Sequence, residues 1–236
     1  MTERQRRLLR TFVRREGRLT QGQARALEAL WPRFGLDCPA SGALDLDALF
    51  GRCAPRVFDI GFGDGEALVE MAAGDPQRDF IGVEVHRPGV GHCLLCAEEA
   101  DVHNLRVATV DGVDLLRHHM PPSSLDRVQA FFPDPWPKKR HHKRRLIQPA
   151  FLDLLAERLA PEGVLHLATD WADYAEWMVA TLEPDPRFIN SADPGPYWAG
   201  PPPRPRTKFE RRGIAKGHAV YDLIYRFRPA NSAAPR

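Results

Sequence analysis

A glycine-rich turn joins a short apolar strand to an amphipathic helix in the first third of the chain. Residues 56–60 (Arg-Val-Phe-Asp-Ile) have the apolar character of a strand, and the turn Gly-Phe-Gly-Asp-Gly follows at 61–65. Leu68, Val69 and Ala72 then recur at helical spacing over 66–73. This order is typical of the first unit of an open α/β sheet, which binds its ligand beyond the carboxyl end of the strand.

The rest of the chain alternates between strand and helix patterns. We expect strands over 80–85, 105–110, 125–132, 164–168 and 220–227, and helices over 88–100, 147–159 and 173–181. A turn is expected at 161–163, and a stiff loop at 194–205, where six prolines exclude a helix. The alternation predicts a parallel sheet that is covered by helices on both faces.

The 236 residues are predicted to form one domain between two shorter segments. Residues 1–22 are rich in arginine and are expected to form a mobile basic arm, 23–228 the domain and 229–236 a disordered tail. No apolar run approaches the roughly 20 residues that cross a bilayer and no signal segment opens the chain, so we expect no membrane partner. Four cysteines are too few for a disulfide scaffold, which favours a reducing, cytoplasmic location.

Basic residues gather in three places, although the net charge is only +2. Besides the N-terminal arm, they cluster over 138–145 and 204–216. The two clusters comprise Lys138, Lys139, Arg140, Lys143, Arg144 and Arg145, and Arg204, Arg206, Lys208, Arg211, Arg212 and Lys216. One basic run is most often a solvated surface, but three runs in a nearly neutral chain indicate a polyanionic partner, with nucleic acid as the first candidate.

The acids around the glycine turn discriminate between nucleotide ligands. A dinucleotide site has the spacing G-x-G-x-x-G and places a pyrophosphate at the helix N-terminus, whereas here Glu66 occupies the position of the third glycine. Asp59, Asp64 and Glu66 would repel a pyrophosphate, but they suit a ligand that carries positive charge and no phosphate. S-adenosylmethionine (SAM), with its sulfonium and ammonium groups, has that chemistry.

Two further predicted strands end in an acid. Glu84, after the second strand, is expected to accept hydrogen bonds from two ribose hydroxyls, and Asp111, after the third, to meet the adenine amino group. Acids at successive strand ends line the ligand crevice of an open α/β sheet. The alternative is that each acid only caps the helix that follows it. For the set as a whole we favour the cofactor site.

The most unusual stretch is Phe-Phe-Pro-Asp-Pro-Trp-Pro-Lys at 131–138. The prolines stiffen the backbone and hold Asp134 at the mouth of the fourth strand, while Lys138 begins a run suited to phosphates. An acid between stacking aromatics and basic residues resembles a site for an extruded base. The alternative is a proline-capped turn, and for Trp136 alone we expect core packing.

These motifs together resemble the bacterial tRNA (guanine-N7)-methyltransferase family, TrmB. The matching stretches are GRLTQGQ at 17–23, DIGFGDG at 59–65, GVEVHRPGVG at 82–91, FFPDPWPKKRHHKRR at 131–145, ATDW at 168–171 and TKFERRG at 207–213. The resemblance implies an α/β fold with a Rossmann-like, seven-stranded class I methyltransferase sheet and helices on both faces. It also implies SAM as donor, and as acceptor N7 of the guanine at position 46 in the variable loop of tRNA.

Site residues follow from the same resemblance, motif by motif. The implied donor residues are Asp59, Gly61, Gly63, Gly65, Glu84, Asp111 and Asp134. The implied tRNA residues are Lys138, Asp170, Thr207, Lys208, Phe209 and Glu210. The family's first motif commonly reads Glu-Ile-Gly, so Asp59 keeps the charge on a shorter side chain. The family includes monomers and homodimers, and either state is expected here.

N7 of guanine carries a lone pair and no proton, so its methylation needs no general base at that atom. Alignment and charge should supply the catalysis, because the guanine ring gains the positive charge that the sulfonium loses. We assign Asp134 as the catalytic residue that stabilises this charge, either by hydrogen bonds from the Watson–Crick edge or by proximity.

Other functions fit parts of the pattern. His92, Cys93 and Cys96 suggest a metal, but a second cysteine pair is missing from the sequence, and we expect core thiols and no metal. A nicotinamide-dependent oxidoreductase would need the third glycine, and the intact acids disfavour an inactive RNA-binding protein. A methyltransferase of exocyclic amino groups would carry an acid-Pro-Pro-aromatic signature instead of Asp-Pro-Trp at 134–136.

Overall fold

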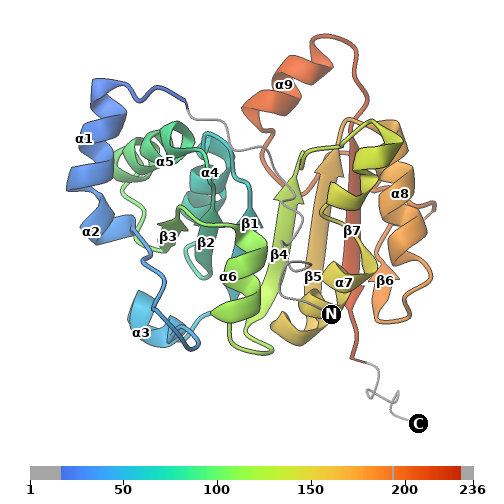
Figure 1. Ribbon diagram of the computed structural model, residues 1–236, viewed down its shortest axis with the longest axis horizontal. Coiled ribbons are helices and arrows are strands. Elements are labelled where there is room, and N and C mark those ends of the chain that lie inside the picture. The colour runs from blue at the N-terminus through green and yellow to red at the C-terminus, as the bar shows by residue number, and fades with distance from the viewer. Residues whose placement is uncertain (1–16, 193, 230–236) are drawn as a thin grey trace.

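The computed structural model of the protein describes residues 17–192 and 194–229, which form a seven-stranded sheet between two layers of helices (Figure 1). The strand order is β3-β2-β1-β4-β5-β7-β6. The strands are β1 Arg56–Ile60, β2 Asp79–Val83, β3 Leu105–Ala108, β4 Leu125–Phe131, β5 Leu159–Thr169, β6 Phe188–Asn190 and β7 Tyr221–Phe227. The prediction of an α/β fold with seven strands and helices on both faces is confirmed.

The helices follow the expected alternation and add several short elements. They are α1 Gln21–Ala29, α2 Trp31–Phe34, α3 Leu46–Phe50, α4 Glu66–Gly74, α5 Arg87–Glu99, α6 Gly112–His118, the 3-10 helix η2 Lys139–Arg144, α7 Pro149–Arg158, α8 Ala172–Leu182 and α9 Lys208–Ile214. Helix α1 begins with a capping box between Thr20 and Gln23, inside the segment predicted to be a mobile arm. The rest of that arm, residues 1–16, and the tail from 230 onward lie outside the described residues.

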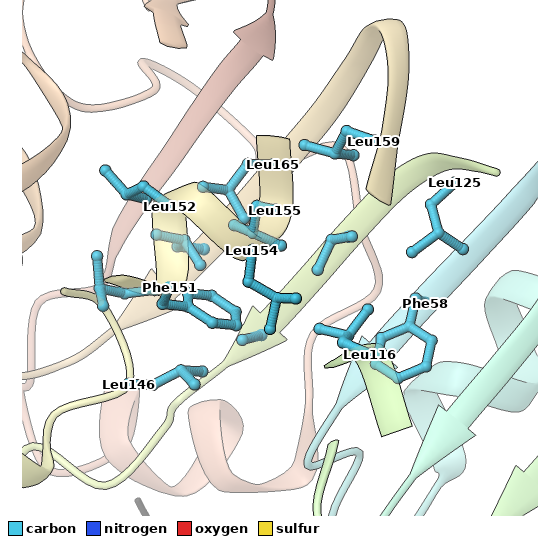
Figure 2. Close-up of a cluster of buried hydrophobic side chains, with 14 of the residues drawn as sticks. Phe58, Leu116, Leu125, Leu146, Phe151, Leu152, Leu154, Leu155, Leu159 and Leu165 are labelled. Carbon is cyan, nitrogen blue, oxygen red and sulfur yellow. The ribbon is translucent and has the colours of Figure 1, made fainter. Parts of the chain in front are cut away.

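Each strand sends alternate side chains to opposite faces of the sheet, and this divides the core in two. Val57 of β1 packs with the apolar faces of α1, α2, α4 and α5. The next residue, Phe58, packs on the other face, where Leu116 of α6 and Phe151 and Leu155 of α7 cover the sheet (Figure 2). Both faces of the central strands are therefore buried, and their polar groups meet solvent only at the strand ends.

The prediction of a parallel sheet is wrong at one strand, β7, which runs opposite to the other six. Strand β7 lies antiparallel between β5 and β6, with Leu167 opposite Leu223 and Asn190 opposite Tyr225. Apolar spacing reports which residues are buried but carries no information about strand direction. The short β6 and the helices α6 and α9 had also not been expected.

Strand β5 starts earlier than predicted. It runs through residues 161–163, where a turn was expected, and its pairing with β4 is irregular at that point. Glu162 has a left-handed backbone (φ 64°) within this irregularity. The Pro-Glu-Gly sequence therefore makes a bulge inside a strand instead of a turn before one.

Strands β1 to β6 run in the same direction and end at the same edge of the sheet. Because β7 is antiparallel to β5 and β6, the segment 191–220 leaves β6 and enters β7 at that same edge. Figure 1 shows α9, which belongs to this segment, above the ends of β4 and β5. No helix in the described part of the chain is both long enough and apolar enough to span a membrane.

Candidate cofactor and substrate site

Two adjoining cavities lie at the edge where the parallel strands end. Their volumes are about 360 and 650 Å³, and both are bounded by the glycine turn after β1, the loop after β4 and helix α9. Of the predicted site residues, nine line one or both: Asp59, Gly61, Gly63, Glu84, Asp111, Asp134, Thr207, Lys208 and Phe209. Gly65, Lys138, Asp170 and Glu210 lie outside their linings.

Asp59 lies at the floor of the smaller cavity and is only 2% exposed. Its Oδ2 accepts a hydrogen bond from Gln129 Nε2 (2.9 Å), while its Oδ1 has no partner among the described residues. Burial raises the pKa of Asp59 to about 7, the hydrogen bond from Gln129 opposes this rise, and the charge of Glu84 adds to it. A buried carboxylate oxygen without a partner is suited to a cationic or hydrogen-bond-donating ligand.

The glycine turn gives a ligand access to the backbone. Gly61 and Gly63 have left-handed backbones (φ 76° and 68°), and a Cβ at either would point into open space. Gly65 has a different role, because a Cβ there would lie 2.3 Å from Cys93 Cβ of α5. The first two glycines therefore form the cavity wall, and the third allows α4 to pack closely on α5.

Glu84 is held by main-chain donors at the end of β2. Its Oε2 accepts a hydrogen bond from Gly63 N (3.0 Å) and its Oε1 one from His86 N (2.9 Å). Each carboxylate oxygen has a further lone pair, so the residue can still accept bonds from a ligand. These contacts fix the carboxylate at the cavity wall and tie the glycine turn to β2.

Asp111 caps a helix and also faces a cavity. Its Oδ1 accepts a hydrogen bond from Val113 N (2.9 Å) and caps α6, as the capping alternative requires. The same residue also lines the larger cavity. Burial raises its pKa, while the hydrogen bond from Val113 N–H opposes that rise.

The other two acids of the glycine turn are paired with cations of α9. Lys208 Nζ lies 3.5 Å from Asp64 Oδ2 and 3.4 Å from Glu66 Oε1, and Arg211 Nη2 donates to Glu66 Oε2 (2.8 Å). Glu66 does not line either cavity. The predicted set of three ligand-facing acids is therefore reduced to Asp59 and the partly neutralised Asp64.

The loop after β4 places Asp134 in the wall of the larger cavity. Phe132 and Trp136, two residues before and after it, both have left-handed backbones (φ 57° and 46°), which are unfavourable for bulky side chains. Trp136 is partly exposed, with Arg144 4.9 Å above its ring, so the expectation of core packing is wrong. Strain on both sides of a cavity-lining acid is characteristic of functional loops.

A buried arginine braces this loop from below. Arg145 is 1% exposed, and its Nε donates to the carbonyl of Pro135 (2.9 Å), while its guanidinium pairs with Asp173. The rings of Tyr174 and Trp177 lie at 4.9 and 5.2 Å from it. Arg145 was grouped with the phosphate-binding cluster, but it is structural. Lys138, Lys139, Arg140 and Lys143 are exposed, as predicted for that cluster.

The third basic cluster divides in the same way. Arg204 is buried and pairs with Asp222 and with Glu210 (Nη1 to Oε2, 2.6 Å), beneath the rings of Phe131 and Phe132. Glu210 is 3% exposed and also completes the capping box with Thr207 that starts α9. Both residues therefore anchor α9 to the sheet.

Phe209 is the most exposed large apolar residue that borders the cavities. Its side chain is 56% exposed, and its ring lies 5.2 Å from that of Phe132. Asp170, at the end of β5, is held beside the site by His218, with 3.1 Å between Oδ2 and Nδ1. Arg212 lines both cavities, but the sequence analysis placed it only in the basic cluster 204–216 and not among the site residues. Arg212 follows Lys208 by four residues, which places both on one face of a helix. This spacing could have indicated its location, but helix α9 had not been expected.

The thiols that raised the metal alternative lie behind the glycine turn. Cys93 is buried, which raises the pKa of its thiol, and the ring of His92 contacts the carbonyl of Asp64 (2.9 Å). Among the described residues, no group of His, Cys, Asp and Glu side chains is arranged to hold a metal ion.

Comparisons with known proteins identify relatives of this chain. Residues 53–223 match the model of a family described as "Putative methyltransferase". The chain is 76% identical to a tRNA (guanine-N(7)-)-methyltransferase of Halorhodospira halophila, over 93% of this chain and 95% of that protein. Among solved structures, it resembles the 16S rRNA methyltransferase KamB (TM-score 0.58, 14% identity, 83% of this chain and 98% of that one). It also resembles a 16S rRNA (adenine(1408)-N(1))-methyltransferase from Catenulisporales acidiphilia, solved with SAM (TM-score 0.51, 14% identity, 81% and 95% covered).

Proposed function

The chain belongs to the tRNA (guanine-N7)-methyltransferase family, and we propose that it transfers the methyl group of SAM to N7 of guanine 46 in the variable loop of tRNA. The observation that carries this proposal is the joint presence, in adjoining cavities, of Asp59, Glu84 and Asp111 at the ends of β1, β2 and β3 and of Asp134 on its strained loop. The first set fits the donor, and the second fits an extruded base.

The cavity chemistry fits SAM, which supplies an activated methyl group on a sulfonium when it is bound. Asp59 offers a buried carboxylate oxygen without a partner, and Gly61 and Gly63 leave room for close approach to the backbone. Glu84 would accept the ribose hydroxyls and Asp111 the adenine amino group. The acids would favour the positive end of the ligand, and a pyrophosphate would be repelled.

Asp134 would act on the acceptor base. Its carboxylate would accept hydrogen bonds from the N–H groups of the guanine Watson–Crick edge. These bonds would hold the base and stabilise the positive charge that develops on the ring. The exposed face of Phe209 offers a stacking surface at the cavity mouth. The exposed cations of residues 138–143 would hold the tRNA backbone, with a steep dependence on salt.

Other residues around the cavities would position the RNA. We expect Thr207 and Lys208 to position the RNA from the edge of the smaller cavity, and Lys138 and Asp170 from outside it. Glu210 would support them indirectly, through the start of α9. The enzyme would work in the cytoplasm, as a monomer or a homodimer, and without a metal.

The direct test is methyl transfer to unmodified tRNA. The protein is incubated with methyl-labelled SAM and a tRNA transcript that carries guanine at position 46, and the product nucleosides are separated. We expect labelled 7-methylguanosine, and its loss when guanine 46 is replaced by adenine. Label in another nucleoside would contradict the assignment of guanine N7 as the acceptor atom. Formation of 7-methylguanosine in the adenine-46 transcript would contradict the assignment of position 46.

A nicotinamide-dependent oxidoreductase is the alternative from another class. Titration with NADH would show saturable binding in that case. We expect none, because the acids of the glycine turn would face its pyrophosphate.

A further inference from the structure

We propose that Arg212 binds the carboxylate of the methionine part of the donor. This inference rests on the proposed function, because it assumes that SAM occupies the cavities. It assigns a role to a residue of the stretch TKFERRG that was not among the predicted site residues, and it explains how a cavity rich in acids can bind a zwitterion that carries both an ammonium and a carboxylate.

The cavity walls are dominated by negative charge. Asp59, Asp64, Glu84, Asp111 and Asp134 all line one or both cavities. These acids suit the sulfonium and the ammonium of SAM, but they repel its carboxylate. The carboxylate therefore needs a cation or free N–H groups at a defined place.

The glycine turn has few free N–H groups to offer. Gly61 N donates to the carbonyl of Val83 (2.8 Å) and Gly65 N to that of Phe62 (3.2 Å). Gly63 N donates to Glu84 and Glu66 N to Asp64 Oδ1 (3.3 Å). This turn is consequently unlike a phosphate-binding loop, whose amides point at the anion.

Among the described residues, two lysine or arginine side chains line the cavities, and both lie on α9. Lys208 is engaged with Asp64 and Glu66 at 3.5 and 3.4 Å. Arg212 follows one turn later on the same side of the helix, and it lines both cavities. Within residues 17–192 and 194–229 its guanidinium has no hydrogen-bond or ion-pair partner. A planar guanidinium in this position can bind a carboxylate through two parallel N–H donors.

Charge also argues against the guanine as the partner of Arg212. A cation beside the ring would oppose the positive charge that the ring gains during methylation. Phosphates have a separate set of exposed cations on the segment 138–143, outside the cavities. The donor carboxylate lies at the end of the methionine chain, away from the reacting methyl group, and there a cation carries no such cost.

The test compares two donors that differ only in this group. Decarboxylated SAM keeps the sulfonium and the amine but lacks the carboxylate. Dissociation constants for both ligands are measured by calorimetry on the parent protein, on Arg212→Ala and Arg212→Gln, and on Lys216→Ala. Lys216 is an exposed cation just after α9 that does not line the cavities, so its replacement removes the same charge from the same segment.

We expect Arg212→Ala and Arg212→Gln to weaken SAM binding by about tenfold or more, because each lost charge-assisted hydrogen bond has this order of effect. Binding of decarboxylated SAM should change by less than about threefold, and Lys216→Ala should change neither constant. Equal losses for both ligands, or no loss for either, would overturn the role of Arg212 while leaving SAM binding by the parent intact. A parent protein that binds neither ligand would overturn the proposed function as well.

Discussion

The side of the site that we propose to bind the donor and the side that we propose to bind RNA are built in different ways. The acids at the strand ends are held mainly by the backbone: Glu84 by Gly63 and His86, and Asp111 by Val113. The cations on the other side are exposed, or they pair with side chains, as Lys208 and Arg211 do with Glu66. Main-chain contacts fix a small ligand's site whether or not it is occupied. Partly exposed ion pairs are weak and exchangeable, so polyanion phosphates can compete for the same cations.

Two buried arginines differ from these exposed cations. Arg145 and Arg204 belong to the basic clusters by sequence, but each lies under an aromatic layer and is paired with acids. They brace the loop of Asp134 and the start of α9. The exposed cations that we propose to bind RNA therefore lie on segments that buried ion pairs hold in place.

The largest effect is expected from removing the charge of Asp134, which lines the larger cavity together with Phe209 and Arg212 of α9. Asp134→Asn should lower the single-turnover rate at saturating SAM and tRNA by about 10²–10³-fold, because one preorganised electrostatic contact to the developing charge is lost. Asp114→Asn, an exposed acid on α6, serves as the matched control. A rate close to that of the parent would make Asp134 only a turn residue.

A smaller effect is expected from Glu84, on the donor side alone. Glu84→Ala should weaken SAM binding by at least about tenfold, because two charge-assisted hydrogen bonds to the ribose are removed. The affinity for tRNA should stay within about twofold of the parent, and Glu99→Ala, an exposed acid of α5, should change neither. Parallel losses of SAM and tRNA affinity would mean that the two binding sites are coupled, and Glu84 would then not act on donor binding alone.

The exposed cations test the RNA side alone. The double change Lys139→Ala and Arg140→Ala should reduce the slope of log affinity against log salt by about one to two, since each phosphate contact contributes roughly one. Its matched control is Arg226→Ala with Arg228→Ala, which removes two exposed charges at the opposite end of the sheet. Equal slopes for the two double variants would exclude the segment 138–143 as the RNA track.

The smallest effect concerns the pH dependence of SAM binding. The pKa of Asp59 is raised to about 7, so the carboxylate that a cationic ligand prefers becomes more populated between pH 6 and pH 8. The affinity of the parent relative to that of Asp59→Asn should therefore rise over this range, by up to about tenfold. The ratio cancels the titration of the donor's own amine. In the free protein the sign is opposite: the folded state holds a proton that the unfolded state loses above about pH 4, so this group's contribution to the free energy of unfolding falls as the pH rises toward 7. An affinity ratio that does not change with pH would show that Asp59 does not ionise on binding.

Sequence patterns correctly predicted those parts of the structure that depend on interactions between residues close together in the chain. The strand 56–60, the glycine turn and the acids Glu84 and Asp111 lie where the sequence indicated, because alternating burial and glycine conformation are short-range properties. The paired state of Glu66 and the burial of Arg145 were missed, since both depend on partners far along the chain. Helix α9 did have a local signal, the capping box from Thr207 to Glu210, but its seven residues follow a proline-rich stretch that hides it.

The antiparallel strand β7 has a consequence for how such enzymes can diversify. Strands β6 and β7 pair as neighbours, so the two ends of the segment 191–220 are held close together by the sheet, whatever the segment contains. Lengthening a loop between fixed ends costs little free energy, because closure entropy grows slowly with length. This one continuous stretch carries Thr207, Phe209 and Arg212 over the cavities, while the acids come from the other half of the sheet. The topology therefore permits Thr207 and Phe209, which we propose to face the RNA, to be exchanged by replacing this one segment, provided that the replacement keeps Arg212 for the donor.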